Sequence, residues 1–228
     1  MEKAVVTENI GRVRLIRLNR PKALNAMNQA LIIALRDVLL ESAEDSNIAV
    51  CVLTGEGRAF CAGQDMDEMS TMNGTDASQT AFPSMLEQLI HFPKPLIAAV
   101  NGVGVGIGMT MLAYCDLVLM ADSAKLRTPF PQLGLAPEAG SSFTFQHRMG
   151  WQNAAYTLMS GRWLSAEECR EFGYAWRVVD IASLLEETLA IANEMGMNPI
   201  SSLISTKKAR HVAGRSNSSD APHVNGQQ

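Results

Sequence analysis

The stretch VNGVGVGIGMTMLAYCDLVLMAD, residues 100–122, carries a glycine at every second position from Gly102 to Gly108. Without a side chain, glycine lets the backbone approach a neighbouring strand or ligand closely. One use of such a run is a dinucleotide phosphate loop, with Asp122 as the acid that binds the ribose. A second is a pair of backbone N–H groups that bind an oxygen gaining negative charge during a reaction. A third is close packing of a short helix on a sheet.

The dinucleotide interpretation is disfavoured by length. A parallel crossover requires roughly a dozen residues or more, but only MTMLAY separates Gly108 from Cys115. The glycine spacing also does not match GxGxxG, and the chain has no GK[ST] sequence. The other two uses both stay open on this stretch alone.

Composition indicates one globular domain with a substantial core, because 47% of the 228 residues are hydrophobic and 18% are charged. The net charge is −4, and the largest basic cluster is KKAR at 207–210, which we interpret as a solvated helix face. We therefore expect no nucleic-acid or membrane partner. The amino terminus lacks an apolar run, and the cysteines 51, 61, 115 and 169 form no CxxC pair, so we expect reduced thiols, no metal site and a cytoplasmic location.

Hydrophobic patterns predict strands and helices that alternate along the chain. We expect a hairpin turning at residues 8–11, strands within 48–57, 94–102, 115–122 and 174–180, and helices at 28–46, 85–92, 144–161, 165–173 and 181–195. Asn28 is the expected cap of the first helix, and Ser165 with Glu168 fits a capping box. The expected division is a core at 1–196, the start of a carboxyl-terminal helical region at 197–214 and a disordered tail at 215–228.

Two further segments are candidates for function. Residues 55–69, GEGRAFCAGQDMDEM, follow a predicted strand with a second turn of small residues. Carboxyl ends of parallel strands meet at one edge of a sheet, so the N–H groups of this turn and of the glycine run can converge. The segment 125–142 contains three prolines that forbid a long helix, and long loops of this kind usually carry function.

Several motifs in order resemble the crotonase superfamily, namely the enoyl-CoA hydratases and isomerases. They are NRPKALNAMN, AFCAGQDM, KPLIAAVNG, GIGMTMLAYCDLVLMADSAKLRTP and LGLAPEAGSS, and the resemblance spans roughly Val5 to Arg210. It implies an α/β fold built as a spiral of repeated strand-strand-helix units, with a carboxyl-terminal helical extension. It also implies an acyl-CoA thioester as substrate, so that CoA enters as part of the substrate and no other cofactor is expected.

The resemblance assigns the oxyanion hole to the backbone N–H groups of Gln64 and Ile107. Each such donor is worth about 3 to 4 kcal/mol of transition-state stabilisation when well placed. The substrate-binding residues that it implies are Lys22, Ala23, Leu24, Ala62, Gly63, Gln64, Asp65, Met66, Gly106, Gly108, Thr110 and Phe130.

The chain departs from the hydratase pattern at its two catalytic glutamates, because Thr110 and Phe130 occupy those positions. One carboxylate is present nearby. Glu138, in LGLAPEAGSS, stands where peroxisomal-type delta-3, delta-2-enoyl-CoA isomerases place their acid–base glutamate. A single carboxylate is suited to double-bond migration, since it can take a proton at one carbon and return it at another. The alternative is that Glu138 only caps the helix that follows.

We therefore expect an enoyl-CoA isomerase with Glu138 as its catalytic acid–base group. Three alternatives remain: a ring-acyl-CoA isomerase, a weak hydratase, or a module that binds CoA or a protein without catalysis. The resemblance also implies a homotrimer or a dimer of trimers. The family usually continues with further helix after the region of residues 206–214, so a more open acyl pocket and a weaker trimer are expected.

Overall fold

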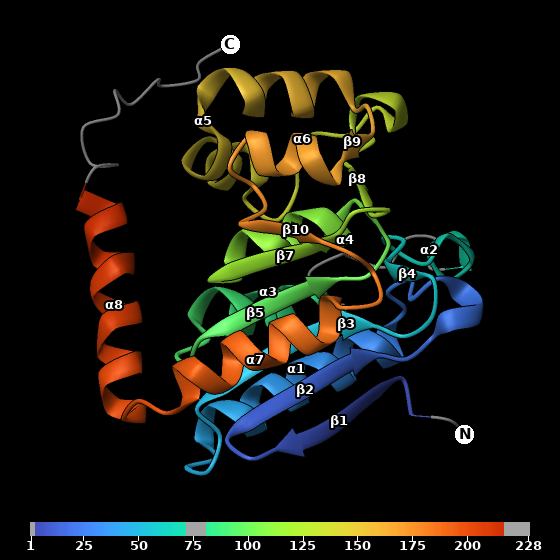
Figure 1. Ribbon diagram of the computed structural model, residues 1–228. Helices are drawn as coiled ribbons and strands as arrows, with labels where there is room; N and C mark the ends of the chain where they lie inside the picture. Colours follow the sequence, from blue (N-terminus) through green and yellow to red (C-terminus); the bar gives the residue numbers. More distant parts are fainter. Residues whose placement is uncertain (1–2, 72–80, 217–228) are drawn as a thin grey trace.

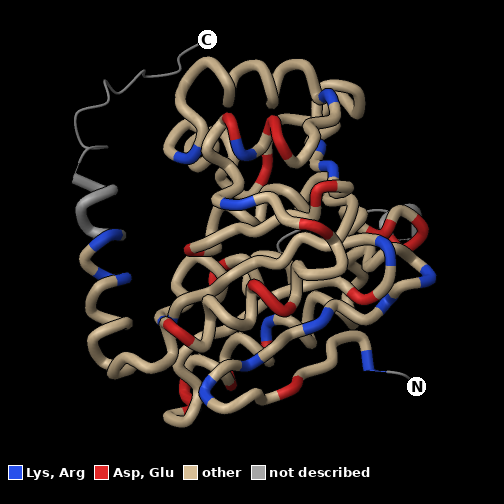
Figure 2. Tube along the Cα trace, in the orientation of Figure 1, with Lys and Arg blue, Asp and Glu red and all other residues tan. Residues whose placement is uncertain are grey.

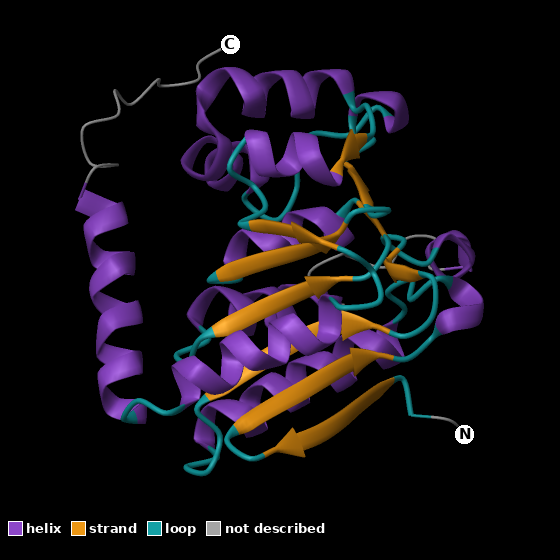
Figure 3. Ribbon diagram, viewed as in Figure 1, coloured by secondary structure: helices purple, strands orange, loops and turns teal. Residues whose placement is uncertain are grey.

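The computed structural model describes residues 3–71 and 81–216, which form two sheets flanked by helices (Figures 1 and 3). The larger sheet has the strand order β1-β2-β3-β5-β7-β10. Its strands are β1 (Val5–Ile10), β2 (Val13–Leu18), β3 (Val50–Gly55), β5 (Leu96–Val100), β7 (Leu117–Ala121) and β10 (Arg177–Val179). Only the β1–β2 pair is antiparallel, as expected for the hairpin predicted at the amino terminus.

A smaller sheet has the order β4-β6-β8-β9. It consists of β4 (Ala59–Cys61), β6 (Val103–Val105), β8 (Lys125–Arg127) and β9 (Leu164–Ser165), in which the first three strands are parallel. Each of β3, β5 and β7 is followed by one strand of this smaller sheet, so successive units add one strand to both sheets. This arrangement is the expected spiral of strand-strand-helix units, and the fold prediction is confirmed.

Helices cover both faces of the larger sheet. α1 (Gln29–Glu44) and α3 (Phe82–His91) pack together on one face, while α7 (Leu184–Gly196) crosses the other (Figure 1). The remaining helical segments are η1 (Pro21–Ala23), α2 (Met66–Thr71), α4 (Ile107–Thr110), η3 (Met111–Tyr114), η4 (Pro131–Leu133), α5 (Ser141–Ser160), α6 (Ala166–Glu171) and α8 (Ile200–Ser216). Asn28 caps α1 and Ser165 with Glu168 forms the capping box of α6, as predicted.

Two structural features explain the glycines of residues 102–108: close packing of the backbone and one unusual backbone conformation. Gly104 lies in β6, a short strand that the hydrophobic pattern did not predict. A side chain on Gly102 would overlap the carbonyl oxygen of Arg58, and one on Gly108 would overlap that of Cys61, so both positions lie against the chain around β4. Gly106 has open space around it, but its φ of 55° and ψ of −118° suit glycine alone.

Helix α8 corrects one expectation about charge. Lys207, predicted to lie on a solvated face, is 5% exposed and forms an ion pair with Asp116 at 2.7 Å. Asp116 also accepts a hydrogen bond from the backbone N–H of Leu96, so this pair ties α8 to the start of β5. α8 continues to Ser216, two residues beyond the expected limit, and the tail predicted after it lies outside the described residues from 217 onward.

We expect Gly108→Ala to destabilise the protein by about 3 kcal/mol or to prevent folding, because overpacking against backbone atoms cannot be relieved by a rotamer change. Urea denaturation would measure the loss. Gly134→Ala is the control, since an added Cβ at Gly134 would meet no atom within 4 Å and would only strain the backbone, whose φ there is 66°. Its expected cost is about 1 kcal/mol. Equal midpoints for the two variants would contradict the packing explanation.

Candidate active site

Three segments meet where the parallel strands of the smaller sheet end. β4 pairs with β6 through Cys61 and Gly104, and β6 pairs with β8 through Val105 and Arg127. The residues after these strands, at 62–64, 106–107 and 128–130, therefore emerge at the same edge. A hydrogen bond of 2.9 Å from the Gly106 N–H to the Arg127 carbonyl continues the ladder past the strand ends.

The predicted oxyanion donors lie in two of these segments. Ile107 is the first residue of α4, so its N–H has no partner within the helix. Met27 lies beside Gln64 in a parallel bridge: its N–H donates to the Gly63 carbonyl, and its carbonyl accepts from the Asp65 N–H. In such a bridge the N–H of Gln64 points away from Met27. Neither donor has an acceptor in the described part of the chain. Two free N–H groups at one edge are suited to binding a carbonyl oxygen.

The segment that carries Lys22, Ala23 and Leu24 lies along the β4 turn. The Leu24 carbonyl accepts a hydrogen bond of 3.0 Å from the Ala62 N–H. Arg20, at the start of the segment, forms an ion pair of 2.8 Å with Asp65, and this hydrogen bond is the main reason that the pKa of Asp65 is lowered. Asp65 thus joins two segments. The side chains of Lys22 and Met66 are exposed and available to a ligand.

Glu138 lies in a loop that is fastened to the end of η3. Its carbonyl accepts hydrogen bonds from the N–H and the hydroxyl of Ser141, at 2.9 and 2.7 Å. The next carbonyl, of Ala139, accepts a bond of 2.6 Å from the hydroxyl of Tyr114. Because η3 continues directly from α4, this bond connects the Glu138 loop to the helix that begins with Ile107.

Burial raises the pKa of Glu138 above the usual range for a carboxyl group, because a partly desolvated site disfavours the charged form. No ion pair or hydrogen bond to its carboxylate is present among the described residues. A carboxylate without a compensating cation is a stronger base than an exposed glutamate. The capping alternative has no support from α5, whose N-cap is Gly140 and which has no side-chain cap.

The two positions that hold glutamate in hydratases are buried and carry no acid. Thr110 is fully buried within α4, and its hydroxyl has no hydrogen-bond partner in the described chain. Phe130 is 4% exposed and is the N-cap of η4. Both residues therefore present neither a base nor an acid to a water molecule at this site.

An apolar hollow of about 480 Å³ lies beside the Glu138 loop. It is lined by loop residues on one side and by α5 on the other: Phe130, Pro131, Leu135, Pro137, Ser142, Gln146, Trp151, Ala154, Ala155, Leu158 and Met159. Phe130 and Pro137 thus connect this hollow to the candidate site.

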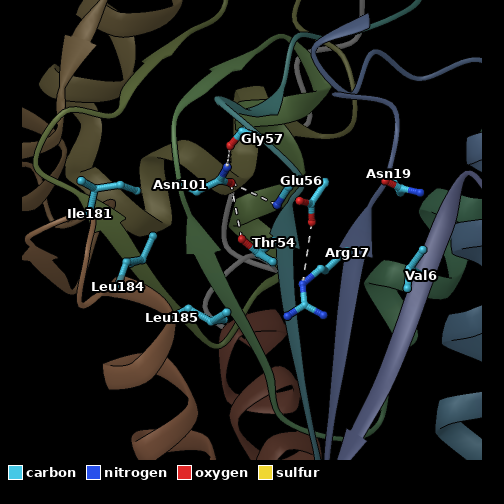
Figure 4. A pocket seen from close by; sticks show the side chains of 11 residues that line it. Val6, Arg17, Asn19, Thr54, Glu56, Gly57, Asn101, Ile181, Leu184 and Leu185 are labelled. Atoms are coloured by element: carbon cyan, nitrogen blue, oxygen red, sulfur yellow. Dashed lines mark hydrogen bonds and ion pairs between the residues drawn. The ribbon is translucent and has the colours of Figure 1, made fainter. Parts of the chain in front are cut away.

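A second pocket, of about 520 Å³, lies where β2, β3 and β5 end near the start of α7 (Figure 4). In it, Asn101 accepts a hydrogen bond from the Gly55 N–H and donates to the Gly57 carbonyl. Glu56 and Glu8 both contact Arg17. The pocket contains none of the residues predicted from the sequence, and its polar groups already have partners within the chain.

The structure also bears on the sequence-based expectations about metal binding, membrane helices, cysteines and charge. The described ranges contain no cluster of three potential metal ligands and no helix long and apolar enough to cross a bilayer. All four cysteines are buried and unpaired, and burial raises the pKa of Cys61 to about 12. Lys and Arg are interspersed with Asp and Glu over the described chain (Figure 2).

The fold and the paired backbone donors define a protein of the crotonase type. Comparison with known families agrees: residues 8–226 match the enoyl-CoA hydratase/isomerase model, and the chain belongs to this family. The crystal structure of enoyl-CoA hydratase EchA8_6 from Mycobacterium marinum superposes with a TM-score of 0.86 at 44% identity, covering 91% of this chain and 98% of that one.

Two relatives from Escherichia coli (strain K12) have different activities in their names. The 2,3-dehydroadipyl-CoA hydratase is 35% identical over 87% of this chain and 78% of its own length. The 1,2-epoxyphenylacetyl-CoA isomerase is 34% identical over 93% of this chain and 80% of its own length. Family membership therefore leaves the choice between hydration and isomerisation to the residues of the site.

Sequence reasoning missed two residues that shape the site, Arg20 and Tyr114. The NRP motif contained Arg20, but its partner Asp65 is 45 residues away, and no local pattern joins them. Tyr114 lies in the segment MTMLAY after the glycine run, and the sequence alone assigned it no role. Only the folded chain shows that its hydroxyl reaches Ala139.

Proposed function

We propose that this protein is an enoyl-CoA isomerase that moves a double bond from the 3 to the 2 position of an unsaturated acyl-CoA, as in the peroxisomal-type delta-3, delta-2 isomerases. Glu138 takes a proton from C2 of the 3-enoyl thioester. The electrons move into a dienolate, whose negative thioester oxygen is stabilised by the N–H groups of Gln64 and Ile107. The protonated Glu138 then returns the proton to C4, and no water is consumed.

The observation that carries this proposal is the half-buried carboxylate of Glu138, for which no ion pair or hydrogen bond is present among the described residues. Hydration needs one group to activate water and another to protonate carbon, whereas isomerisation needs one group that acts twice. Glu138 has its pKa raised by burial, and the positions of the hydratase acids are occupied by Thr110 and Phe130. The proposed reaction needs no metal or redox cofactor, and CoA enters with the substrate.

A ring-acyl-CoA isomerase is the second candidate. The relative named 1,2-epoxyphenylacetyl-CoA isomerase and the apolar hollow beside Phe130 and Pro137 favour it, because an aromatic acyl group suits an apolar lining. Assays with both substrate types distinguish the candidates. We also propose the cytoplasm as the compartment, in keeping with four unpaired thiols, and fractionation of the source cells would test this.

We further propose that the protein assembles as a homotrimer or a dimer of trimers. Large apolar side chains are exposed along α5 and the preceding loop, among them Trp151 at 71% and Met159 at 77%. They continue the apolar hollow around Leu135. An exposed apolar patch of this kind is typical of a surface that another chain covers.

Glu138→Gln is expected to lower kcat for a trans-3-enoyl-CoA by about 10²-fold or more, because glutamine keeps the shape but cannot transfer the proton. Formation of the conjugated 2-enoyl thioester gives the rate, and calorimetric titration with a saturated acyl-CoA gives the affinity. Folding and affinity should be unchanged. Glu167→Gln is the control, since the side chain of Glu167 on α6 is 57% exposed. A kcat within about threefold of wild type, less than 1 kcal/mol of barrier, would exclude Glu138 as the base.

The pH profile of the same reaction follows from the raised pKa of Glu138. The base must be ionised, so kcat/KM should fall as the pH decreases through this raised pKa. The acid limb is therefore expected above the usual glutamate value of about 4.3. The limb should be missing from the residual activity of Glu138→Gln. A limb at the same pH in that variant would assign it to another group.

Reaction selectivity provides a separate prediction. Hydration of crotonyl-CoA should be slower than isomerisation of a 3-enoyl-CoA by about 10²-fold or more, the contribution of a missing acid–base group. The measurement compares initial rates for the two substrates with one enzyme preparation. A family member with both hydratase glutamates serves as positive control. Comparable rates would mean that water is activated by a group other than the expected pair.

Assembly can be tested by light scattering at micromolar protein concentration, where we expect a trimer or hexamer. Met159→Glu should reduce the mass, because it places a charge in the apolar surface of α5. Met197→Glu is a matched control, since Met197 is 83% exposed at the end of α7, away from that surface. A wild-type protein that is a stable monomer would refute the proposed assembly.

A further inference from the structure

We propose that Tyr114 is a positioning residue, which holds the Glu138 loop in fixed register with the oxyanion donor of Ile107. This inference rests on the proposed function of Glu138. Tyr114 itself touches no reacting atom in the proposed reaction. It acts through the backbone of the residue next to the base.

The geometry begins with one continuous helical segment. Ile107 is the first residue of α4, and Tyr114 is the last residue of η3, which follows α4 without a break. The Tyr114 hydroxyl donates a hydrogen bond of 2.6 Å to the carbonyl of Ala139. One side chain thus joins the two parts of the site: the segment that supplies the donor and the loop that supplies the base.

The loop has a backbone that needs such a restraint. Ala139 has a φ of 49° and Gly140 a φ of 66°, so two successive residues are left-handed. For alanine this conformation costs roughly 1 to 2 kcal/mol and persists only where surrounding contacts impose it. The hydrogen bonds from Ser141 fix the carbonyl of Glu138, and the hydrogen bond from Tyr114 fixes the carbonyl of Ala139. The backbone that carries the Glu138 side chain is thereby held in place at two successive carbonyl groups.

Gly140 fits the same arrangement. A Cβ atom at this position would lie 2.9 Å from the Tyr114 hydroxyl oxygen, closer than such atoms normally approach. The glycine therefore leaves the room that the hydroxyl occupies. A glycine at position 140 thus allows the Tyr114 hydroxyl to reach the carbonyl of Ala139.

The anchor at Tyr114 is itself restrained from the other side. Arg148 of α5 donates hydrogen bonds to the carbonyls of Ala113 and Cys115, the two neighbours of Tyr114. Tyr174 donates to the carbonyl of Met109 in α4 at 2.7 Å. The helical segment from α4 to η3 is thus held at several points, so that Tyr114 can impose a position on the loop.

Tyr114→Phe removes the hydroxyl and keeps the ring. We expect kcat for the 3-enoyl-CoA to fall between about 10-fold and 10²-fold, the effect of a small misplacement of a catalytic group. KM and the affinity for a saturated acyl-CoA should stay within twofold of wild type. The acid limb of the pH profile should move, because the surroundings of Glu138 change. Tyr156→Phe is the matched control, since its ring is 55% exposed and its hydroxyl has no partner among the described residues.

A double variant separates positioning from a purely structural role. If Tyr114 acts through Glu138, then Tyr114→Phe should cost less than twofold when Glu138→Gln is already present. An equal loss in both backgrounds would overturn the inference. If Glu138→Gln is inactive while Tyr114→Phe behaves as wild type, only the inference fails. If Glu138→Gln is fully active, the proposed function fails.

Gly140→Ala approaches the same contact from the loop and covers the case in which Tyr114→Phe does not fold. The added methyl group crowds the Tyr114 hydroxyl, and alanine at a φ of 66° also strains the loop backbone, so a loss of kcat with unchanged affinity is again expected. This loss should also be absent in the Glu138→Gln background. Activity of Gly140→Ala equal to that of wild type would contradict the role of the Tyr114 contact.

Discussion

The close approach of α4 to the end of β4 is the constraint on which the site depends. The carbonyl oxygen of Cys61 occupies the space that any side chain on Gly108 would need. Because the two segments touch backbone to backbone, the residues that follow β4 and those that begin α4 share one edge of the smaller sheet. The positions of Gln64 and Ile107 are thereby set by packing, before any ligand is bound. Preorganised donors of this kind need no rearrangement as charge develops on a substrate oxygen.

Two backbone donors, Gln64 and Ile107, lack an acceptor in the described part of the chain, in a region where most backbone groups are hydrogen-bonded. Buried N–H groups are nearly always paired within a protein. The N–H of Ile107 is unpaired because Ile107 begins a helix, and the conformation of Gly106 turns the chain sharply before it. The N–H of Gln64 is unpaired because the bonds to Met27 are made by its neighbours, Gly63 and Asp65. Close packing, one of the two uses left open by the sequence, explains Gly102 and Gly108, while Gly106 has a conformation that suits glycine alone.

The sequence predicted much of this arrangement because its signals are local. Helix α1 with its Asn28 cap and α6 with its capping box follow from residues a few positions apart. The individual strands of the smaller sheet were not predicted from the hydrophobic pattern, because they are short and β6 contains Gly104. Lys207 was misjudged for another reason: its partner Asp116 is 91 residues away, and a basic cluster on a helix ordinarily faces solvent. Contacts between distant segments, such as Tyr114 with Ala139, have no local signal in a single sequence.

The electrostatic design of the site bears on the choice between the two reactions in its family. Two carboxylates that share a small pocket repel each other, so a hydratase site must supply polar groups that separate their pKa values. Here burial raises the pKa of Glu138, and no second acid occupies the position of Thr110 or Phe130 to oppose or share its charge. A lone, partly desolvated carboxylate is a competent base and, once protonated, a competent acid. Because the loop that carries Glu138 is fastened at Tyr114 and Ser141, one fixed group would serve two carbons of the substrate in turn in the reaction that we propose.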